Sequence, residues 1–443
     1  MQQISTLEDI PYVTLPEDYP SNPGPFLART YQQHGPIFRT RTDWWQDVVY
    51  LVGPEANRFV LASNRLKFSH RQGWGQFFGV IETYGDGLLT MDGPEHDQHR
   101  RMMNPAFTIS YMDRYLPLMN RIIRERTATW LDRGEVDVFE EARKITFDIA
   151  AEALVGLQTG PEVDRFREIF FGLIMLGQVP DEDGKDYNTR LAELQGELYE
   201  LLLPKIRRRR EHPTDDVLGM LVRARDDQGN ALSDEQLIAH TNILLVAGHE
   251  TSTSLSAWLL YLLSQHPGYA RRVLDEQSAL LACGADPTLE AVKRMKLLEH
   301  ALSEAERLYP PVSNGPRGVL EDFEFGGYHV PAGTHVFYSI AGAHYIPTIF
   351  ANPERFDPDR FAPPREEHKT PYALVGFGGG PRICIGINFA QVEVKAMATH
   401  ILRHYTLAPV PGHEIQHVYY SPVAALPNGM PLRVTRRTAQ TSD

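Results

Sequence analysis

The chain has 443 residues, of which 42% are hydrophobic and 23% are charged, and its formal net charge is -13. The hydrophobic fraction is enough for a substantial core, and the negative balance argues against nucleic acid as the main partner. The two cysteines, Cys283 and Cys384, lie far apart. They provide neither a disulfide framework nor a CxxC zinc pattern, which fits a reducing compartment.

The N-terminal part of the chain predicts short helices and strands. Residues 1–20 contain acidic residues and prolines but no long apolar run, so they fit neither a signal peptide nor a membrane anchor. A short helix is expected over 24–33 and strands over 36–52, where Val48–Val52 is the clearest. Another helix should begin at Pro54, because proline suits the first helical turn.

Residues 64–93 show no regular periodicity and are rich in glycine and aromatic side chains such as Trp74. A long irregular segment in a compact domain is usually functional or mobile. An ordinary surface loop with its aromatic side chains turned inward explains the composition equally well. The next helix should start at Pro94, which places His96 and Arg100 four residues apart on one face. That spacing is also common on surface helices.

Amphipathic patterns predict several helices in the middle of the chain, over 111–132, 140–157 and 164–176. Residues 177–188 are polar and contain Gly and Pro, so they predict a loop before another helix that ends near Arg210. The apolar stripe Phe170–Leu176 either lines a pocket or packs into the core. The basic run Arg207–Arg210 suits the end of a helix, where cations complement the dipole.

The longest helical pattern runs from Ser233 to about Gln265, and Ser-Asp-Glu is a good start signal. Its centre, Ala247–Thr251, interrupts the pattern with a glycine that costs about 1 kcal/mol relative to alanine. The hydroxyl of Thr251 can bond to the carbonyl of Ala247, which bends helices. The result is either a groove for a small ligand and water or a kink that serves packing.

A further helix is expected over 296–309, ending before Pro310 because the residue before a proline avoids helical angles. It carries Glu304 and Arg307 on one face. Downstream, alternating apolar residues between glycine-rich turns predict strands near 317–340. The run PERF, which contains Arg355, follows.

The most informative stretch is FGGGPRICIG, Phe377 to Gly386, which holds Cys384 and precedes a helix-like run. Glycine permits backbone angles closed to other residues and lets the main chain approach a ligand closely. A thiolate that faces a metal needs backbone N–H groups and the positive end of a helix nearby. A buried structural cysteine beside a glycine loop is the simpler alternative.

The spacing of this stretch resembles the heme-binding loop of the cytochrome P-450 family, in which a Cys thiolate ligates the iron. AGHET resembles the family's oxygen-activation motif, PEH-x-x-x-R its propionate-binding helix, and ExxR…PERF its structural triad. The resemblance covers nearly the whole chain, with four motifs in the family's order. It implies a mainly α fold with a smaller β-rich lobe, and heme b between the long central helix and the helix after the Cys loop.

The resemblance assigns roles to residues of this sequence. Cys384 is the metal ligand, and Glu250 and Thr251 are catalytic through proton delivery. The other implied heme contacts are His96, Arg100, Ala247, Arg317, Phe377, Gly378, Arg382 and Gly386. Many soluble bacterial members have His where Arg382 stands, so the loop is more similar to the microsomal type. Glu304, Arg307 and Arg355 would lock the fold beneath the heme.

The implied activity is a monooxygenase that inserts one oxygen atom of O2 into a hydrophobic small molecule that is lipid-like, terpenoid or steroid-like. Electrons would come from a separate ferredoxin or flavoprotein, attracted by a basic face that includes Arg101 and Lys395. The alternatives are a heme-thiolate peroxygenase, isomerase or dehydratase, and a non-catalytic heme-binding sensor or carrier. Reductant-driven oxygen consumption and product formation distinguish them.

We expect one domain over 1–443, with about 36–70 and 317–340 contributing to the β lobe and a disordered tail over 436–443. In the family, the segment around 177–188 is part of a lid and 64–93 covers the distal heme face. The expected protein is soluble, cytoplasmic and bacterial, with no membrane anchor and no nucleic-acid partner.

Overall fold

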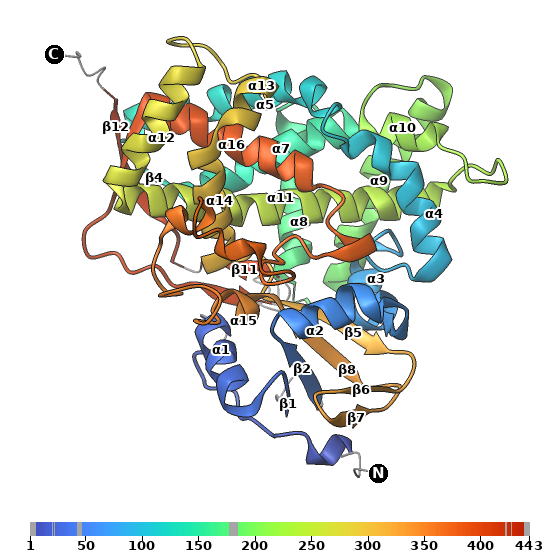
Figure 1. Ribbon diagram of the computed structural model, residues 1–443. Helices are drawn as coiled ribbons and strands as arrows, with labels where there is room; N and C mark the ends of the chain where they lie inside the picture. The colour runs from blue at the N-terminus through green and yellow to red at the C-terminus, as the bar shows by residue number, and fades with distance from the viewer. Residues whose placement is uncertain are drawn as a thin grey trace.

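The structure is a computed structural model that describes residues 6–437 except 20, 22, 42–46, 177–184, 421–422 and 427. A large helical body surrounds one long helix, α11 (Asp234–Gln265), and a smaller lobe that contains a sheet lies below it in Figure 1. The prediction of a mainly α fold with a smaller β-rich lobe is therefore confirmed.

The sheet of the β lobe joins strands from distant parts of the chain in the order β1-β2-β8-β5-β3. The strands are β1 (Ile37–Thr40), β2 (Val48–Val52), β3 (Phe68–Ser69), β5 (Asn314–Val319) and β8 (His335–Ser339). β2 is buried along its whole length, as its continuous apolar run predicts, and it pairs in parallel with β8, with Val48 opposite His335. β5 begins before the expected range of 317–340, and it carries Arg317 toward the helical body.

Two helices, α1 (Pro23–His34) and α2 (Pro54–Arg58), accompany this sheet, and a hairpin of β6 (Phe323–Phe325) and β7 (Tyr328–Val330) extends the lobe (Figure 1). The helical body contains α4 (Gly93–Met103), α5 (Met112–Thr127), α6 (Trp130–Arg133), α7 (Val138–Val155), α8 (Pro161–Met175), α9 (Tyr187–Glu211), α10 (Val217–Arg223), α12 (Pro267–Leu280), α13 (Leu289–Arg294), α14 (Lys296–Leu308) and α16 (Ile387–His404). The short helix α15 (Ile340–His344) follows β8 directly and packs against α1.

The long helix α11 starts where its sequence signal predicts. The Ser233 hydroxyl accepts a hydrogen bond from the Gln236 N–H at 3.1 Å, and the Gln236 side chain accepts one from the Ser233 N–H at 3.0 Å. This capping box satisfies two backbone donors at the helix start. α11 packs against α7 on one side and α16 on another, so it crosses the core of the molecule.

Residues 64–93 are more regular than their sequence suggested. They form the 3-10 turn η3 (Arg65–Lys67), strand β3, the π-helical turn η4 (Arg71–Phe77) and α3 (Val80–Tyr84). The Asp92 carboxylate holds the segment by accepting hydrogen bonds from the His70 N–H at 2.7 Å and the Ser69 hydroxyl at 2.5 Å. Elements this short, one of them wound with a π-helical period, produce no 3.6-residue repeat that a sequence can display.

The C-terminal segment adds a three-stranded sheet of β4 (Glu135–Asp137), β12 (Pro431–Arg436) and β9 (Tyr405–Pro409), and a pair of β10 (Val418–Tyr420) and β11 (Val423–Ala425). The disorder expected from 436 is wrong for the first two residues of that range, because Arg436 belongs to β12 and the Arg437 N–H donates to the His404 carbonyl at 3.0 Å. Residues 438–443, and 177–184 of the expected lid loop, lie outside the described residues. No helix of the described chain is long and apolar enough to cross a membrane.

Candidate active site

The loop that carries Cys384 closes on itself through its backbone. The Cys384 N–H donates to the Phe377 carbonyl at 2.9 Å, and two glycines between them, Gly378 and Gly380, have φ angles of +73° and +61°. A Cβ at Gly380 would also collide with the Leu61 carbonyl. The glycine-rich sequence is therefore required by the left-handed backbone and by close contact with the neighbouring turn.

The Cys384 residue is exposed toward the cavity, while the surrounding protein keeps bulk water from its sulfur and supplies hydrogen-bonding groups. Burial raises the pKa of the thiol, whereas the N–H of Gly386 and the positive charge of Arg100 act in the opposite direction. Gly386 is also the N-cap of α16, so the positive end of that helix points toward the sulfur. These features match what a thiolate ligand of a metal needs.

Cys384 lies at the wall of a cavity of about 300 Å³ between α11 and the Cys loop. Ten predicted site residues meet in the lining of this one cavity: His96, Arg100, Ala247, Thr251, Arg317, Phe377, Gly378, Arg382, Cys384 and Gly386. Glu250 is the predicted site residue that does not line it. The remaining lining is largely apolar and includes Trp74, Leu88, Leu89, Ile243 and Leu244.

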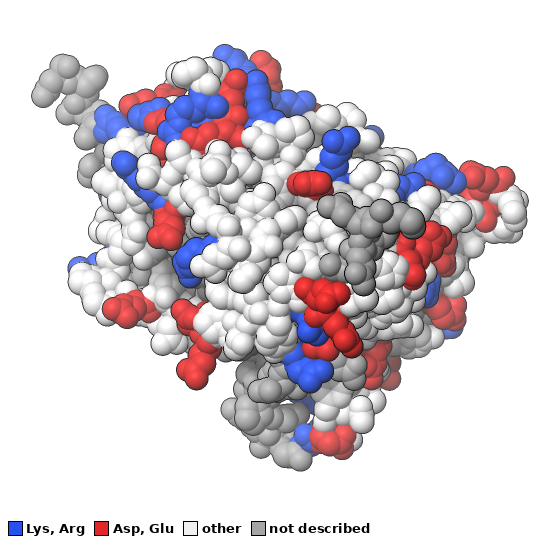
Figure 2. Space-filling model, turned by 60° about the horizontal axis from the view of Figure 1, so that its bottom comes forward, with Lys and Arg blue, Asp and Glu red and all other residues white. Residues whose placement is uncertain are grey.

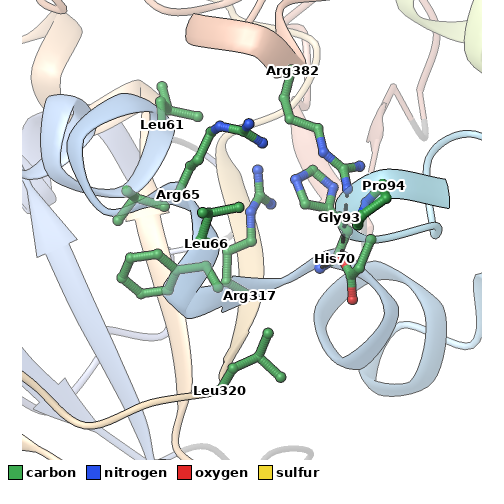
Figure 3. Close-up of a pocket in the computed structure, with 12 residues that line it drawn as sticks. Leu61, Arg65, Leu66, His70, Gly93, Pro94, Arg317, Leu320 and Arg382 are labelled. Atoms are coloured by element: carbon green, nitrogen blue, oxygen red, sulfur yellow. Dashed lines mark hydrogen bonds and ion pairs between the residues drawn. The ribbon is translucent and has the colours of Figure 1, made fainter. Parts of the chain in front are cut away.

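Cationic side chains gather at one end of the cavity. Figure 3 shows the guanidinium groups of Arg65, Arg317 and Arg382 directed toward a common space beside His70. Arg317 is only 4% exposed, and its guanidinium donates to the Pro316 carbonyl at 2.7 Å and stacks on the Tyr338 ring. Arg382 donates to the Met91 carbonyl and lies 3.5 Å from Asp92.

This cluster of cations fits an anionic ligand. Burying a charge without an opposite charge is costly, and within the described chain the cluster has Asp92 as its nearest acid, beside Arg382, while Asp97 lies 3.8 Å from Arg65. Two carboxylates of a heme would supply the missing negative charge and bidentate acceptors. Arg100 and His96 complete the set from α4, and burial together with Arg382 lowers the pKa of His96 to about 4. His96 is therefore a neutral donor near pH 7.

Arg65 and His70 were not predicted as site residues. Both precede the helix that carries His96, in a segment without periodicity, and they reach the cluster because η3 and β3 fold back along β5. The position of Arg65 and His70 in the cluster depends on the pairing of Phe68 with Val319 in the sheet. These two residues are far apart in the sequence, so the spacing of residues along the chain could not predict it.

The predicted bond within α11 is confirmed, because the Thr251 hydroxyl donates to the Ala247 carbonyl at 2.7 Å. Thr251 thus presents its oxygen to the cavity from a fixed position. Glu250, its neighbour, turns toward α7 instead: the Arg143 guanidinium donates to its carboxylate at 2.8 Å, and His249 lies 3.1 Å away. Burial alone would raise the pKa of Glu250, but Arg143 and His249 lower it to about 2.

The expected role of Arg355 in the structural triad is wrong. Arg307 donates to both oxygens of Glu304 at 2.7 and 2.9 Å, as predicted, but the third member is Arg360, whose Nε lies 3.1 Å from Glu304. Arg355 contributes its backbone carbonyl, and its side chain is exposed. The sequence contains two similar runs, PERF and PDRF, and the second one supplies the buried arginine.

A histidine next to this triad connects it to the Cys loop. His344 is fully buried; its Nε2 accepts a hydrogen bond from the Val375 N–H at 3.1 Å, so its Nδ1–H donates to the Arg307 carbonyl at 3.2 Å. Burial lowers the pKa of His344 to about 3, which keeps the ring neutral. The sequence analysis assigned this residue no role, because its function depends on partners on two other elements.

The basic face proposed for an electron donor is not supported in its predicted form. Lys395 is buried and pairs with Glu299 at 3.0 Å, and Arg101 pairs with Asp227 at 2.9 Å. Arg100 donates to the Ile383 carbonyl at 2.7 Å. Figure 2 shows lysines and arginines standing beside acidic side chains on the face that it displays, most densely along its upper edge.

The apolar stripe Phe170–Leu176 belongs to the core rather than to the cavity. Phe170 is fully buried and stacks on Tyr84, and its ring also lies against His249. Phe171 is partly exposed and covers the Arg143 guanidinium. The simpler of the two interpretations of this stripe therefore holds, and the aromatic residues that line the cavity come from other segments: Trp74, Phe107, Tyr338, Phe377 and Phe389.

Comparison with known proteins agrees with this geometry. The family model described as Cytochrome P450 matches residues 13–432. A cytochrome P450 120 of the cyanobacterium Synechocystis is 34% identical over 90% of this chain and 89% of its own length. A sterol 14alpha-demethylase of Mycolicibacterium vanbaalenii is 28% identical over 95% of each chain. The solved structure of retinoic acid bound cyanobacterial CYP120A1 superposes with a TM-score of 0.85, at 31% identity, over 98% of this chain and all of its own. The matched family model spans nearly the whole chain, and this protein therefore belongs to the cytochrome P450 family of heme-thiolate monooxygenases.

Proposed function

We propose that this cytochrome P450 binds heme b through Cys384 and inserts one oxygen atom of O2 into an apolar, isoprenoid-type molecule. The observation that carries the proposal is a single cavity that combines a cysteine sulfur, several arginines with few acidic partners and an otherwise apolar wall beside Thr251. Electrons would reach it from a separate ferredoxin or flavoprotein.

Residues of the cavity lining would hold the cofactor. Cys384 would ligate the iron, and Arg100, Arg317, Arg382 and His96 would bind the two carboxylates. Bound heme would supply oxygen activation, which a thiolate ligand favours. Thr251 would hold a proton-carrying water or its own hydroxyl proton on the α11 side of the cavity, from the position that the Ala247 carbonyl fixes. The apolar wall would exclude bulk water.

The part of the cavity next to α11 supports an apolar substrate. The lining includes the apolar side chains of Trp74, Leu88, Leu89, Ile243 and Leu244, while its cationic side chains would be occupied by the heme carboxylates. Apolar pockets with few polar groups select ligands by shape and burial. Relatives named for retinoic acid binding and for a sterol reaction support an isoprenoid-type substrate for this chain.

The test is a binding and turnover screen with the heme-loaded protein. Retinoids, sterols and linear terpenoids should shift the heme absorption band and yield oxygenated product when a surrogate ferredoxin, its reductase and O2 are present. Sugars and amino acids should do neither. Tight binding of hydrophilic compounds alone would contradict the substrate class. Product formed only with added peroxide, or without net oxidation, would instead identify a peroxygenase or an isomerase.

A further inference from the structure

A buried acid on α14 faces the Cys loop and has no role in the chemistry described above. Glu306 immediately precedes Arg307 of the buried triad, but it takes no part in that ion pair and instead lines the cavity together with Cys384. The residue is only 7% exposed. A carboxyl in such a place is costly unless it is neutral or hydrogen-bonded, so its partners indicate what it does.

The carboxyl of Glu306 packs against Gly376, which directly precedes the Cys loop. The Gly376 N–H donates a hydrogen bond to the carboxyl. A Cβ at this position would collide with the Oε1, Cγ and Cδ atoms of Glu306, so residue 376 has to lack a side chain for the acid to lie here. Phe377 comes next, and its carbonyl accepts the hydrogen bond from the Cys384 N–H. The acid is therefore attached to the same stretch of backbone that positions the sulfur.

No cation neutralises Glu306. Burial raises its pKa to about 8, the Gly376 N–H opposes this only in part, and no lysine, arginine or histidine of the described chain contributes to the shift. The ionisable groups of the surrounding elements have other partners: Arg307 donates to the acid of the triad, and Arg100 of α4 acts on the sulfur. His344 of α15, behind the loop, is neutral. Glu306 therefore carries its proton at neutral pH and loses it in mildly alkaline solution.

The charge of Glu306 acts on the sulfur through space. An ionised Glu306 raises the pKa of the Cys384 thiol, whereas the hydrogen bond to that sulfur comes from the Gly386 N–H. In a site that contains little water, a unit charge acts over several ångströms with weak screening. A negative charge beside the thiolate stabilises the oxidised, more positive state of a bound heme relative to the reduced state. Ionisation of Glu306 must therefore oppose reduction.

We infer that Glu306 is a positioning residue that sets, through Cys384, the reduction potential of the bound heme, which is higher while the carboxyl is neutral and lower once it is ionised. The effect is reciprocal by linkage, so that reduction of the heme makes Glu306 hold its proton more tightly. The electron comes from the separate donor proposed above, and the proton that Glu306 binds comes from solvent. The inference rests on the proposed binding of heme through Cys384.

The test is a spectroelectrochemical titration of the heme-loaded protein, without organic substrate, from neutral to alkaline pH. The potential of the parent should fall as the pH rises through about 8. Glu306→Gln keeps the shape of the side chain and an acceptor for the Gly376 N–H but cannot ionise, so this variant should lose that fall and keep the potential of the parent at neutral pH. Glu306→Leu cannot ionise either, and it keeps the test decisive if Glu306→Gln does not fold.

Glu393→Gln is the matched control. Glu393 is a buried acid of α16 whose pKa burial also raises to about 8, but it does not line the cavity and does not contribute to the pKa of the Cys384 thiol. This variant should keep the fall in potential.

An unchanged pH dependence in the Glu306 variants would overturn the inference, and so would loss of the fall in Glu393→Gln alone. A failure of the proposed function looks different. Without a heme on Cys384, the reduced, carbon-monoxide-bound protein would lack the red-shifted Soret band of a thiolate ligand. A wrong substrate class would leave these potentials unchanged, because they are measured without substrate.

Discussion

The two cysteines differ in what surrounds their sulfur atoms. Cys384 faces the cavity from a glycine-rich loop, with the Gly386 N–H and Arg100 beside it, whereas Cys283 lies at an exposed turn after α12. Cys384→Ala should therefore abolish the red-shifted Soret band that the reduced, carbon-monoxide-bound protein gives with a thiolate ligand. Cys283→Ala is the control and should leave the band unchanged. Loss of the band in Cys283→Ala alone would reverse the assignment.

The Thr251 hydroxyl donates a hydrogen bond to the Ala247 carbonyl. Its role can be tested by comparing Thr251→Ala, which removes the hydroxyl, with Thr251→Ser, which keeps it. Thr251→Ala removes the only polar group that this residue presents to the cavity, so proton delivery should fall by a large factor, up to the 10²–10⁴ typical of a positioned donor. We expect reductant to be consumed still, with less product and more hydrogen peroxide per reductant. Thr251→Ser keeps the hydroxyl and should lose far less.

Heme content and substrate-induced spectral shifts provide the check on this pair, because neither depends on the hydroxyl. They should match the parent protein in both variants. If Thr251→Ala couples reductant to product as well as the parent does, the residue serves only the packing of α11.

At the scale of elements, the buried triad joins α14 to the segment that leads to the Cys loop. Arg360 is completely buried, and its guanidinium bonds to Glu304, Glu367 and the Ala351 carbonyl. Removing one member of a buried ion pair leaves an uncompensated charge and costs about 3–5 kcal/mol. Arg360→Ala should therefore lower the free energy of unfolding by about that amount.

The chain offers a matched control for this prediction in Arg355, an arginine of the same segment whose side chain is exposed. Arg355→Ala should cost less than about 0.5 kcal/mol, as surface substitutions usually do. Thermal unfolding followed by circular dichroism, on parent and both variants with matched heme content, measures the difference. Equal destabilisation by the two variants would contradict the assignment of Arg360 as the third member of the triad.

Elements that carry a complete local signal were predictable. α11 has a capping box, a long apolar pattern and the Thr251–Ala247 spacing, all of which the structure reproduces. The choice between Arg355 and Arg360 was not predictable from one sequence, because PERF and PDRF differ in burial and not in local pattern. The π-helical turn η4 was not predicted either, because its period matches neither the 3.6-residue repeat of an α-helix nor the two-residue repeat of a strand.

At the scale of the whole molecule, the part of the site that the sequence could not reveal is the state of its buried groups. Glu250 and Glu393 have the same side chain and are both buried, yet one is paired with Arg143 of α7 and the other has no charged partner. Only the packing of α7 and α16 against α11 decides this difference. The cationic cluster likewise combines η3, β5 and the Cys loop, which no sequence spacing connects.

The same buried groups make stability depend on pH in two opposite directions. Burial lowers the pKa of His344 and His240 to about 3, so their contribution is complete above the ordinary histidine pKa of about 6.5 and is lost as the pH falls toward 3. Burial raises the pKa of Glu306 and Glu393 to about 8. Their contribution is complete below the unfolded pKa of about 4.3 and is lost as the pH rises through about 8.

Between about pH 6.5 and pH 8 the two kinds of buried group act in opposite directions. The unfolded chain still releases protons from histidines whose folded pKa is lowered by burial, which raises the free energy of unfolding with pH. Each of the two acids lowers it by up to about 1.4 kcal/mol per pH unit, because the folded chain keeps a proton that the unfolded chain has released.

The acids are therefore measured by difference from the parent. As the pH rises across this window, the free energy of unfolding of Glu393→Gln should gain on that of the parent by up to about 1.4 kcal/mol per pH unit, and the double variant with Glu306→Gln by about twice as much. Glu324→Gln, at an exposed position, is the control and should run parallel to the parent. Denaturant unfolding followed by circular dichroism at several pH values measures the effect, and a Glu393→Gln curve parallel to that of the parent would show that this carboxyl is not protonated in the folded chain.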